Sequence, residues 1–219
     1  MKLISLNVSE AVEISHMGRT FTTGIFKKPV TGSVMLRSWP RNLDGDGQGD
    51  LDSHGTEHKA VYAYSLEHYE YWKQELGRDD LAFGQFGENF TVQEMREEEV
   101  HIGDVFRFGN ALVEVTQPRN PCYKLGMKMG MPDFQDRFIK SQHIGFYMRV
   151  LQEGKVWAGS DVERIRVGKG RLTVQAIHTL RFYRQRDVEG LKHALSIKAL
   201  SHEWRRQLED LLNNATNSL

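Results

Sequence analysis

Alternating apolar and polar residues predict that residues 1–167 are mainly β-structure. Segments that follow a period of two, or are continuously apolar between turn residues, are expected to form strands. They cover residues 12–16, 21–26, 33–37, 60–64, 100–108, 111–116, 146–151 and 162–167. The pair 100–108 and 111–116 is separated by Gly109-Asn110, which predicts a β-hairpin. Because no strand–helix–strand rhythm is present, we expect a mixed α/β fold that is mainly β, a mostly antiparallel barrel.

Helical spacing appears twice within this region. Apolar residues three or four positions apart from Leu66 to Leu76 share one helix face, with Ser65 as N-cap and Gly77 as terminator. A second, shorter helix is expected after residue 132, where two phenylalanines are four positions apart. Both helices would flank the strands.

Beyond residue 167 the pattern becomes helical. The expected segments cover residues 174–180, 188–195 and 202–212, preceded by the N-cap residues Thr173, Asp187 and Ser201. Between residues 163 and 219 there are 11 Lys and Arg against 6 Asp and Glu. We therefore divide the chain into a β-domain of residues 1–167 and a small basic three-helix domain of residues 168–219.

Composition excludes several classes of protein. The chain has 219 residues with 39% hydrophobic and 26% charged, as in ordinary globular proteins. Lys and Arg total 29, as do Asp and Glu, so the positive excess needed to coat nucleic acid or membrane is absent. No run approaches the roughly 20 apolar residues of a membrane span, and the start is not a secretory signal. We expect a cytoplasmic protein.

The single cysteine, Cys122, ends the run Gln117-Pro118-Arg119-Asn120-Pro121-Cys122, where two prolines are expected to exclude regular structure. A thiol reacts or binds metal as the thiolate, and the nearby Arg119 cation favours that form. The prolines would hold the sulfur in place, as a metal ligand requires. Lone cysteines are more often buried and inert, so spacing alone leaves both interpretations open.

Residues 42–58 form a polar loop rich in Gly and Asp, too long for a simple hairpin connection. Counted from Asp44, the twelfth position is Gly55 and not the glutamate of a calcium-binding EF-hand. Zinc could bind His54, His58 and neighbouring carboxylates, although Gly55 makes a His-Glu-x-x-His helix implausible. A solvated loop explains the same residues.

Two further segments carry polar residues suited to ligands. In the run 86–90, Gly87 permits close backbone approach, Glu88 offers an acceptor and Asn89 an amide. Lys27 and Lys28 stand at a strand end, where lysines bind phosphate as point charges. A turn and a solvated rim are the alternatives. The sequence has no Gly-x-Ser-x-Gly elbow, P-loop or dinucleotide-binding fingerprint.

In this order the segments resemble the MOSC family, named for the C-terminal domain of molybdenum-cofactor sulfurase, and most closely its YiiM branch. The resembling residues are Lys-Lys-Pro-Val at 27–30, Gly45-Asp46 with Asp50, His54-Gly55, Ala60-Val61-Tyr62, Phe86-Gly87-Glu88-Asn89, Gly103-Asp104 and residues 117–125. The resemblance covers about residues 1–165, and the last helices resemble the 3-alpha appendage of this branch. Thr56 departs from the glycine common there, which should alter loop flexibility more than chemistry.

The resemblance implies a MOSC-type β-barrel and a molybdenum cofactor (molybdopterin) whose metal is bound by Cys122. Positions matching residues that would hold the cofactor are Lys28, His54, Gly55, Asn89, Arg119, Asn120 and Cys122. Cys122, His54 and Glu88 are the implied catalytic residues; either His54 or Glu88 would supply a proton, and the sequence does not choose between them.

The implied activity is reduction of N-hydroxylated compounds, such as 6-N-hydroxylaminopurine, to amines. Because the chain has no flavin or iron–sulfur motif, electrons would come from a separate flavoprotein or iron–sulfur protein. Two alternatives stay open: a sulfur carrier with a persulfide on Cys122, and a non-catalytic module that binds the cofactor or an anion. The apolar C-terminal helices allow a homodimer, and their basic charge could dock an acidic electron donor.

Overall fold

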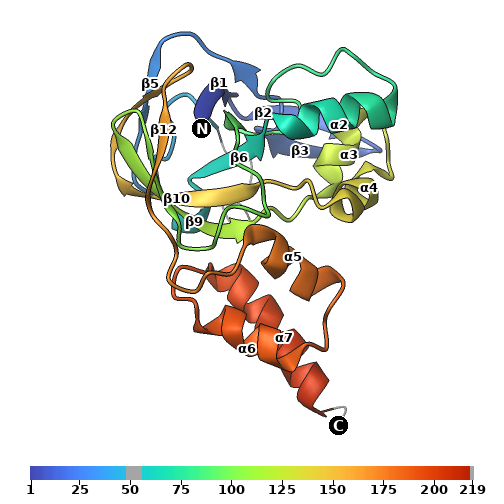
Figure 1. Ribbon diagram of the computed structural model, residues 1–219. Helices are drawn as coiled ribbons and strands as arrows, with labels where there is room; N and C mark the ends of the chain where they lie inside the picture. The colour runs from blue at the N-terminus through green and yellow to red at the C-terminus, as the bar shows by residue number, and fades with distance from the viewer. Residues whose placement is uncertain (48–55, 218–219) are drawn as a thin grey trace.

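The computed structural model describes residues 1–47 and 56–217, which form one large sheet, two small sheets and a set of helices (Figure 1). The strands are β1 (Lys2–Val8), β2 (Val12–His16), β3 (Arg19–Thr23), β4 (Lys28–Pro29), β5 (Ser33–Leu36), β6 (Val61–Ser65), β7 (Phe90–Gln93), β8 (Val105–Phe108), β9 (Ala111–Pro118), β10 (Phe146–Gln152), β11 (Gly154–Trp157) and β12 (Val162–Arg166). The helices are the 3₁₀ helix η1 (Glu57–Lys59), α2 (Glu67–Leu76), α3 (Tyr123–Met129), α4 (Phe134–Ser141), α5 (Val174–Phe182), α6 (Val188–Ser196) and α7 (His202–Asn217).

The large sheet has eight strands in the order β12-β8-β9-β10-β6-β7-β1-β4, and the small sheets pair β11 with β5 and β2 with β3. All strand pairs are antiparallel except β6 with β7. The predicted mixed α/β, mainly antiparallel class is confirmed. The closed barrel is not, because the sheet ends in β12 and β4. Among the described residues, the isolated bridge between Lys2 and Asp161 brings β1 close to the start of β12.

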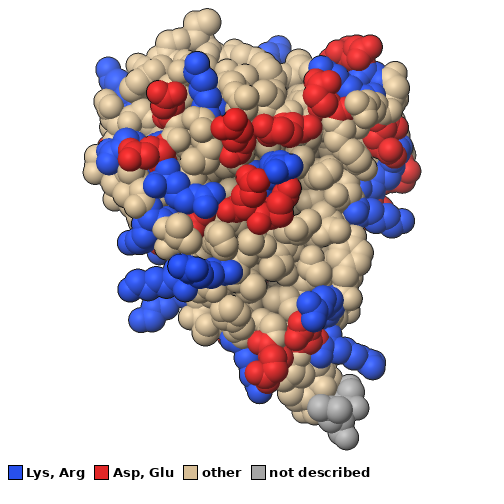
Figure 2. Space-filling model, viewed as in Figure 1, with Lys and Arg blue, Asp and Glu red and all other residues tan. Residues whose placement is uncertain are grey.

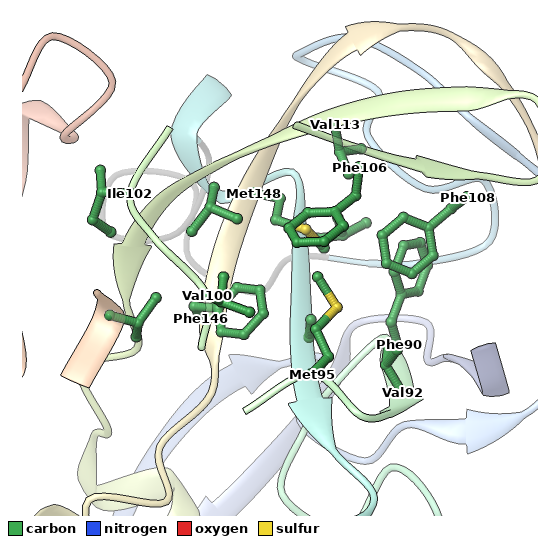
Figure 3. Packing of buried hydrophobic residues seen from close by; sticks show 14 of the residues in the cluster. Phe90, Val92, Met95, Val100, Ile102, Phe106, Phe108, Val113, Phe146 and Met148 are labelled. Atoms are coloured by element: carbon green, nitrogen blue, oxygen red, sulfur yellow. The ribbon is translucent and has the colours of Figure 1, made fainter. Parts of the chain in front are cut away.

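One apolar core fills the sheet and continues into the C-terminal helices. Phe90 of β7 and Phe108 of β8 face one another, and Phe106 and Phe146 belong to the same cluster (Figure 3). Trp204 of α7 belongs to the same cluster and is fully buried. Helix α5 contacts β9 and packs with α6 and α7, so the C-terminal helices share the core of the sheet and are not merely tethered to it (Figure 1).

A second core is mostly aromatic and lies beneath α2 and α4. Tyr64 from β6 contacts Phe86 and Phe138, and Trp72 of α2 stacks on Phe138. The Trp72 indole N–H donates a hydrogen bond to the Tyr64 hydroxyl at 2.7 Å. This cluster supports the loop at residues 86–89 from behind.

Helix ends agree with most of the predictions. The C-terminal N-caps Thr173, Asp187 and Ser201 are confirmed, since each side chain accepts a bond from the backbone N–H three residues later. Gly77 ends α2 in the left-handed conformation, as predicted. Ser65 is not the N-cap of α2, because it is the last residue of β6.

Two other predictions differ from the structure. Strand β9 runs through Pro118, although the prolines were expected to exclude regular structure there. Pro118 is the final residue of the strand, where a missing N–H interrupts the ladder least. The strand predicted from residue 100 begins only at Val105, because a turn with Gly103 at φ 88° precedes it. Helix α3 and strand β11 were not predicted at all.

No helix among the described residues is long and apolar enough to span a bilayer.

Charged residues of both signs are spread over the face in Figure 2. Lys and Arg side chains gather beside the junction of the sheet and the C-terminal helices, and Asp and Glu lie near the centre of the face. Neither sign covers this face as a continuous field.

Candidate functional site

A cleft lies where the loops after β3 and β5 meet η1, β6, β10 and the turn between β9 and α3. Its space of about 630 Å³ includes volume that is open to solvent. Its lining residues are Thr23, Gly24, Ile25, Lys27, Asp46, Gly47, Lys59, Tyr62, Gly87, Asn89, Arg119, Cys122, Lys124 and Tyr147.

The turn that carries Cys122 is held at several points. The Arg119 backbone N–H donates to the Gly145 carbonyl at 3.1 Å, and the Gln135 side chain donates to the Pro121 carbonyl at 2.9 Å. Cys122 has an extended backbone (φ −117°) and is the N-cap of α3. Its side chain is half-buried and lines the cleft. The proline-rich turn therefore gives the sulfur a fixed place with access from the cleft.

Arg119 is a buried cation beside this sulfur. Its guanidinium donates to the Phe86 carbonyl and lies over the Tyr62 ring, 4.5 Å from the ring centroid. Burial by itself lowers the pKa of Arg119, but Tyr62, Tyr147 and Cys122 outweigh that effect, so its pKa lies above the ordinary value. Arg119 is thus a permanent positive charge that packing holds in one position.

The cleft as a whole is basic. Four of its lining residues are cations and one is an anion: Lys27, Lys59, Arg119 and Lys124 against Asp46. Lys27 pairs with Asp46, which also accepts a bond from the Asn89 side chain at 2.9 Å. Lys59 pairs with Glu203 of α7. An excess of cations in a partly enclosed site favours an anionic ligand such as a phosphate.

Glycines allow the backbone to approach closely at this cleft. Gly87 has φ 82°, and a Cβ there would lie 3.0 Å from Cγ1 of Ile25. A Cβ on Gly24 would overlap the Gly47 carbonyl. Larger residues at either position would displace the walls of the cleft.

The structure brings some of the predicted site residues together and leaves others out. Cys122, Arg119 and Asn89 all line the cleft, whereas Asn120 is half-buried in the same turn and is not among the lining residues. Lys28 is exposed on β4, and its neighbour Lys27 faces the cleft instead. The predicted residues His54 and Gly55 lie outside the described residues.

Glu88 does not line the cleft, so the structure offers no support for its predicted role as proton donor. The side chain is fully buried and accepts bonds from the Tyr69 hydroxyl, the backbone N–H of Gly84 and Phe86, and the Thr91 hydroxyl. A carboxylate with that many donors holds the loop at residues 84–91 in shape.

Sequence reasoning missed several residues of the cleft, among them two tyrosines and a lysine. Tyr62 and Tyr147 are direct cross-strand partners on β6 and β10, so both rings project to the same side of the sheet. Burial raises the pKa of Tyr147 to about 12, and it remains a neutral phenol at neutral pH. Lys59 immediately precedes the Ala60-Val61-Tyr62 motif, and that position was the available signal.

Family models match most of the chain. The MOSC domain model matches residues 50–163, and the YiiM-like, 3-alpha helix domain model matches residues 172–215. The chain belongs to the MOSC family, in its YiiM branch.

Individual relatives agree with this assignment. The uncharacterized protein YflK of Bacillus subtilis is 39% identical over 93% of this chain and 90% of its own length. Protein YiiM of Escherichia coli is 33% identical over 85% of this chain and 83% of its own length. The crystal structure of YiiM from Geobacillus stearothermophilus superposes with a TM-score of 0.81 at 33% identity, covering 96% of this chain and 98% of that one.

A longer fungal relative carries a functional name. A protein of Gibberella moniliformis named Reductase is 32% identical over 67% of this MOSC chain, which corresponds to 26% of the fungal protein.

Proposed function

We propose that this MOSC protein is a molybdenum-cofactor-dependent reductase of N-hydroxylated compounds, with Cys122 as the protein ligand of the metal. The observation that carries the proposal is the position of the Cys122 side chain in a basic cleft, beside the buried cation Arg119. The fungal relative named Reductase supports the reaction class.

The residues present fit such a cofactor. A thiolate is a soft ligand of the kind that molybdenum in a sulfur environment accepts. Lys27, Lys59 and Lys124 line the same cleft and would hold the phosphate of the pterin. Gly24, Gly87 and Tyr62 line the same cleft, where the pterin ring system would lie.

The bound cofactor would supply two electrons, which with two protons convert an N–OH group into an amine and water. The chain's own residues would bind the cofactor and orient the substrate. Arg119 holds positive charge next to the sulfur without needing to move, because its guanidinium is fixed by the Phe86 carbonyl and the Tyr62 ring. Tyr147, a neutral phenol in the cleft, can donate a hydrogen bond to the oxygen of the N–OH group.

The electrons would come from a separate flavoprotein or iron–sulfur protein. A solution assay replaces that partner with a chemically reduced viologen dye. The full chain is purified from a host that makes the cofactor, and reduction of 6-N-hydroxylaminopurine is followed by loss of dye colour and by chromatography of the amine product. Cys122→Ser should lose turnover, whether it loses its molybdenum or keeps the metal with one sulfur ligand fewer.

The matched control is Arg107→Lys, which changes an exposed cation on β8 that does not line the cleft. It should turn over like the parent. Equal turnover in Cys122→Ser, or no turnover in parent protein that contains molybdenum, would contradict the proposal. Cyanide-releasable sulfur in protein without metal would favour the persulfide carrier instead.

A further inference from the structure

Outside the cleft lining, two histidines and a glutamate meet where η1 touches the start of α7. Glu57 and His58 belong to η1, and His202 is the first residue of α7. Their potential ligand atoms all lie within 4.8 Å of one another. His58 is 5% exposed, and neither of its ring nitrogens has a hydrogen-bond partner among the described residues. Buried imidazole nitrogens are normally bonded, so this side chain requires an explanation.

The distances in this cluster suit a metal ion better than a hydrogen bond. His58 Nε2 and Glu57 Oε1 are 3.6 Å apart, too far for a hydrogen bond. Two ligands at about 2.0–2.1 Å from a tetrahedral zinc are about 3.3 Å apart. The His58 and His202 ring centroids are 5.1 Å apart at an interplanar angle of 80°. If each ring bound the metal through a nitrogen, with its centroid about 3.2 Å from the ion, that separation would correspond to about 105° at the zinc.

The backbone around the cluster is fixed by a single residue of β9. The Thr116 hydroxyl donates to the His58 carbonyl at 2.6 Å, and the Thr116 carbonyl accepts from the Ser201 N–H at 3.1 Å. Both histidines are therefore held in register by the same strand. Such preorganisation favours metal binding, because less freedom is lost when the ligands close on the ion.

A second cluster of similar composition does not have this geometry. His68 and His143 are stacked, with centroids 4.1 Å apart and an interplanar angle of 24°. That spacing corresponds to only about 80° at a shared zinc. Glu97 is already bonded to His68 and to the backbone N–H of Gly145. This cluster is a buried hydrogen-bonded group, and a variant of it can be compared with variants of the first cluster in zinc binding.

We propose that Glu57, His58 and His202 bind one zinc ion, with water completing the tetrahedron, and that the ion fastens the start of α7 to η1. Imidazole and carboxylate are ligands that zinc accepts readily. The site joins the MOSC region to the 3-alpha helices next to Lys59, and it does not depend on the cofactor or on Cys122.

Zinc titration of the full chain tests the proposal, with a chromophoric chelator as competitor. The titration is made in Cys122→Ser protein, because a free thiol also binds zinc. The expected result is one zinc per chain and a rise in the melting temperature on binding. His202→Ala should weaken binding by about 10-fold or more, since losing a ligand costs at least as much as losing an outer-shell partner. Cobalt in place of zinc should give the strong visible absorption of a four-coordinate ion.

The control variants separate this site from nonspecific binding. His202 is exposed, so His202→Ala is expected to fold, and Glu57→Gln provides a second test. His16→Ala removes an exposed histidine on β2, and His143→Ala removes one from the comparison cluster. Both should bind zinc like the parent. No saturable binding, unchanged affinity in His202→Ala, or an equal loss in His16→Ala would overturn the proposal.

Discussion

Lys59, in the cleft, forms an ion pair with Glu203 in the first turn of α7. The Lys59 side chain is 8% exposed and that of Glu203 29% exposed, so water screens the pair only partly. The contact ties the C-terminal helices to a cation of the cleft, and Lys59 also lies 5.9 Å from the centroid of the Tyr147 ring. The 3-alpha helices are therefore positioned to influence the cleft directly.

Glu203→Gln should lower the free energy of unfolding by about 1–2 kcal/mol, because a partly buried ion pair loses its negative charge. Urea unfolding measures the change. Glu209→Gln alters an exposed glutamate of the same helix and should change stability by less than about 0.5 kcal/mol. Equal stability of both variants would show that the ion pair contributes nothing.

Arg119→Lys should be more disruptive than its conservation of charge suggests. Lysine cannot reproduce the planar contact with Tyr62 while donating to the Phe86 carbonyl. We expect a loss of about 1–2 kcal/mol in the free energy of unfolding and a lower molybdenum content after expression with the cofactor. Arg107→Lys, at an exposed site, should show neither effect. Parent-like stability and metal content in Arg119→Lys would contradict this role.

Gly87→Ala tests the close contacts of the cleft wall. Both Gly87 (φ 82°) and Gly18 (φ 74°) have left-handed backbones, but a Cβ at Gly18 meets no atom within 4 Å. Gly18→Ala therefore measures the backbone effect alone, about 1–2 kcal/mol. Gly87→Ala should cost about 1 kcal/mol more in denaturant unfolding, because its Cβ also presses on Ile25. An equal loss of free energy of unfolding in Gly87→Ala and Gly18→Ala would mean that the side chain of Ile25 moves aside at no cost.

Stability should fall as the pH is lowered from about 6.5 to 4. Burial is the main cause that lowers the pKa of His143 and His178 to about 4. The unfolded chain binds these protons near pH 6.5 and the folded chain only near pH 4, so acid favours unfolding across that window. His178→Phe should reduce the loss of free energy of unfolding between pH 6.5 and 4 by about 2–3 kcal/mol, since His178 is fully buried. Urea unfolding at several pH values measures this dependence, with His16→Ala as the control. A dependence of the free energy of unfolding on pH that is the same in His178→Phe as in the parent would refute the prediction.

The predictable parts of the fold were those set by local patterns. The N-caps at Thr173, Asp187 and Ser201 depend on a side chain and the backbone three residues later, so the sequence alone contains them. The extent of β9 depends on β10, which pairs Pro118 with Phe146. Whether the sheet closes is likewise a property of the assembled strands, and the sequence pattern of a single segment does not indicate it.

The candidate site was predictable where residues stand in short motifs. Arg119 and Cys122 share a turn, Asn89 stands in the run 86–90, and all three line the cleft. Lys27 lines the cleft and Lys28 does not, because successive residues of an extended segment face opposite sides, and the sequence pattern does not say which side is the cleft. Glu203 is far from the motifs along the chain, and its contact with Lys59 arises only from the packing of α7.

The most direct test of the central claim is X-ray absorption at the molybdenum edge, on full-length protein purified from a cofactor-producing host. If Cys122 binds the metal, the parent spectrum requires a protein sulfur in addition to those of the cofactor. Cys122→Ser should then either lose its molybdenum or show one sulfur neighbour fewer. Identical sulfur coordination in the parent and in Cys122→Ser, with equal molybdenum content, would contradict the account.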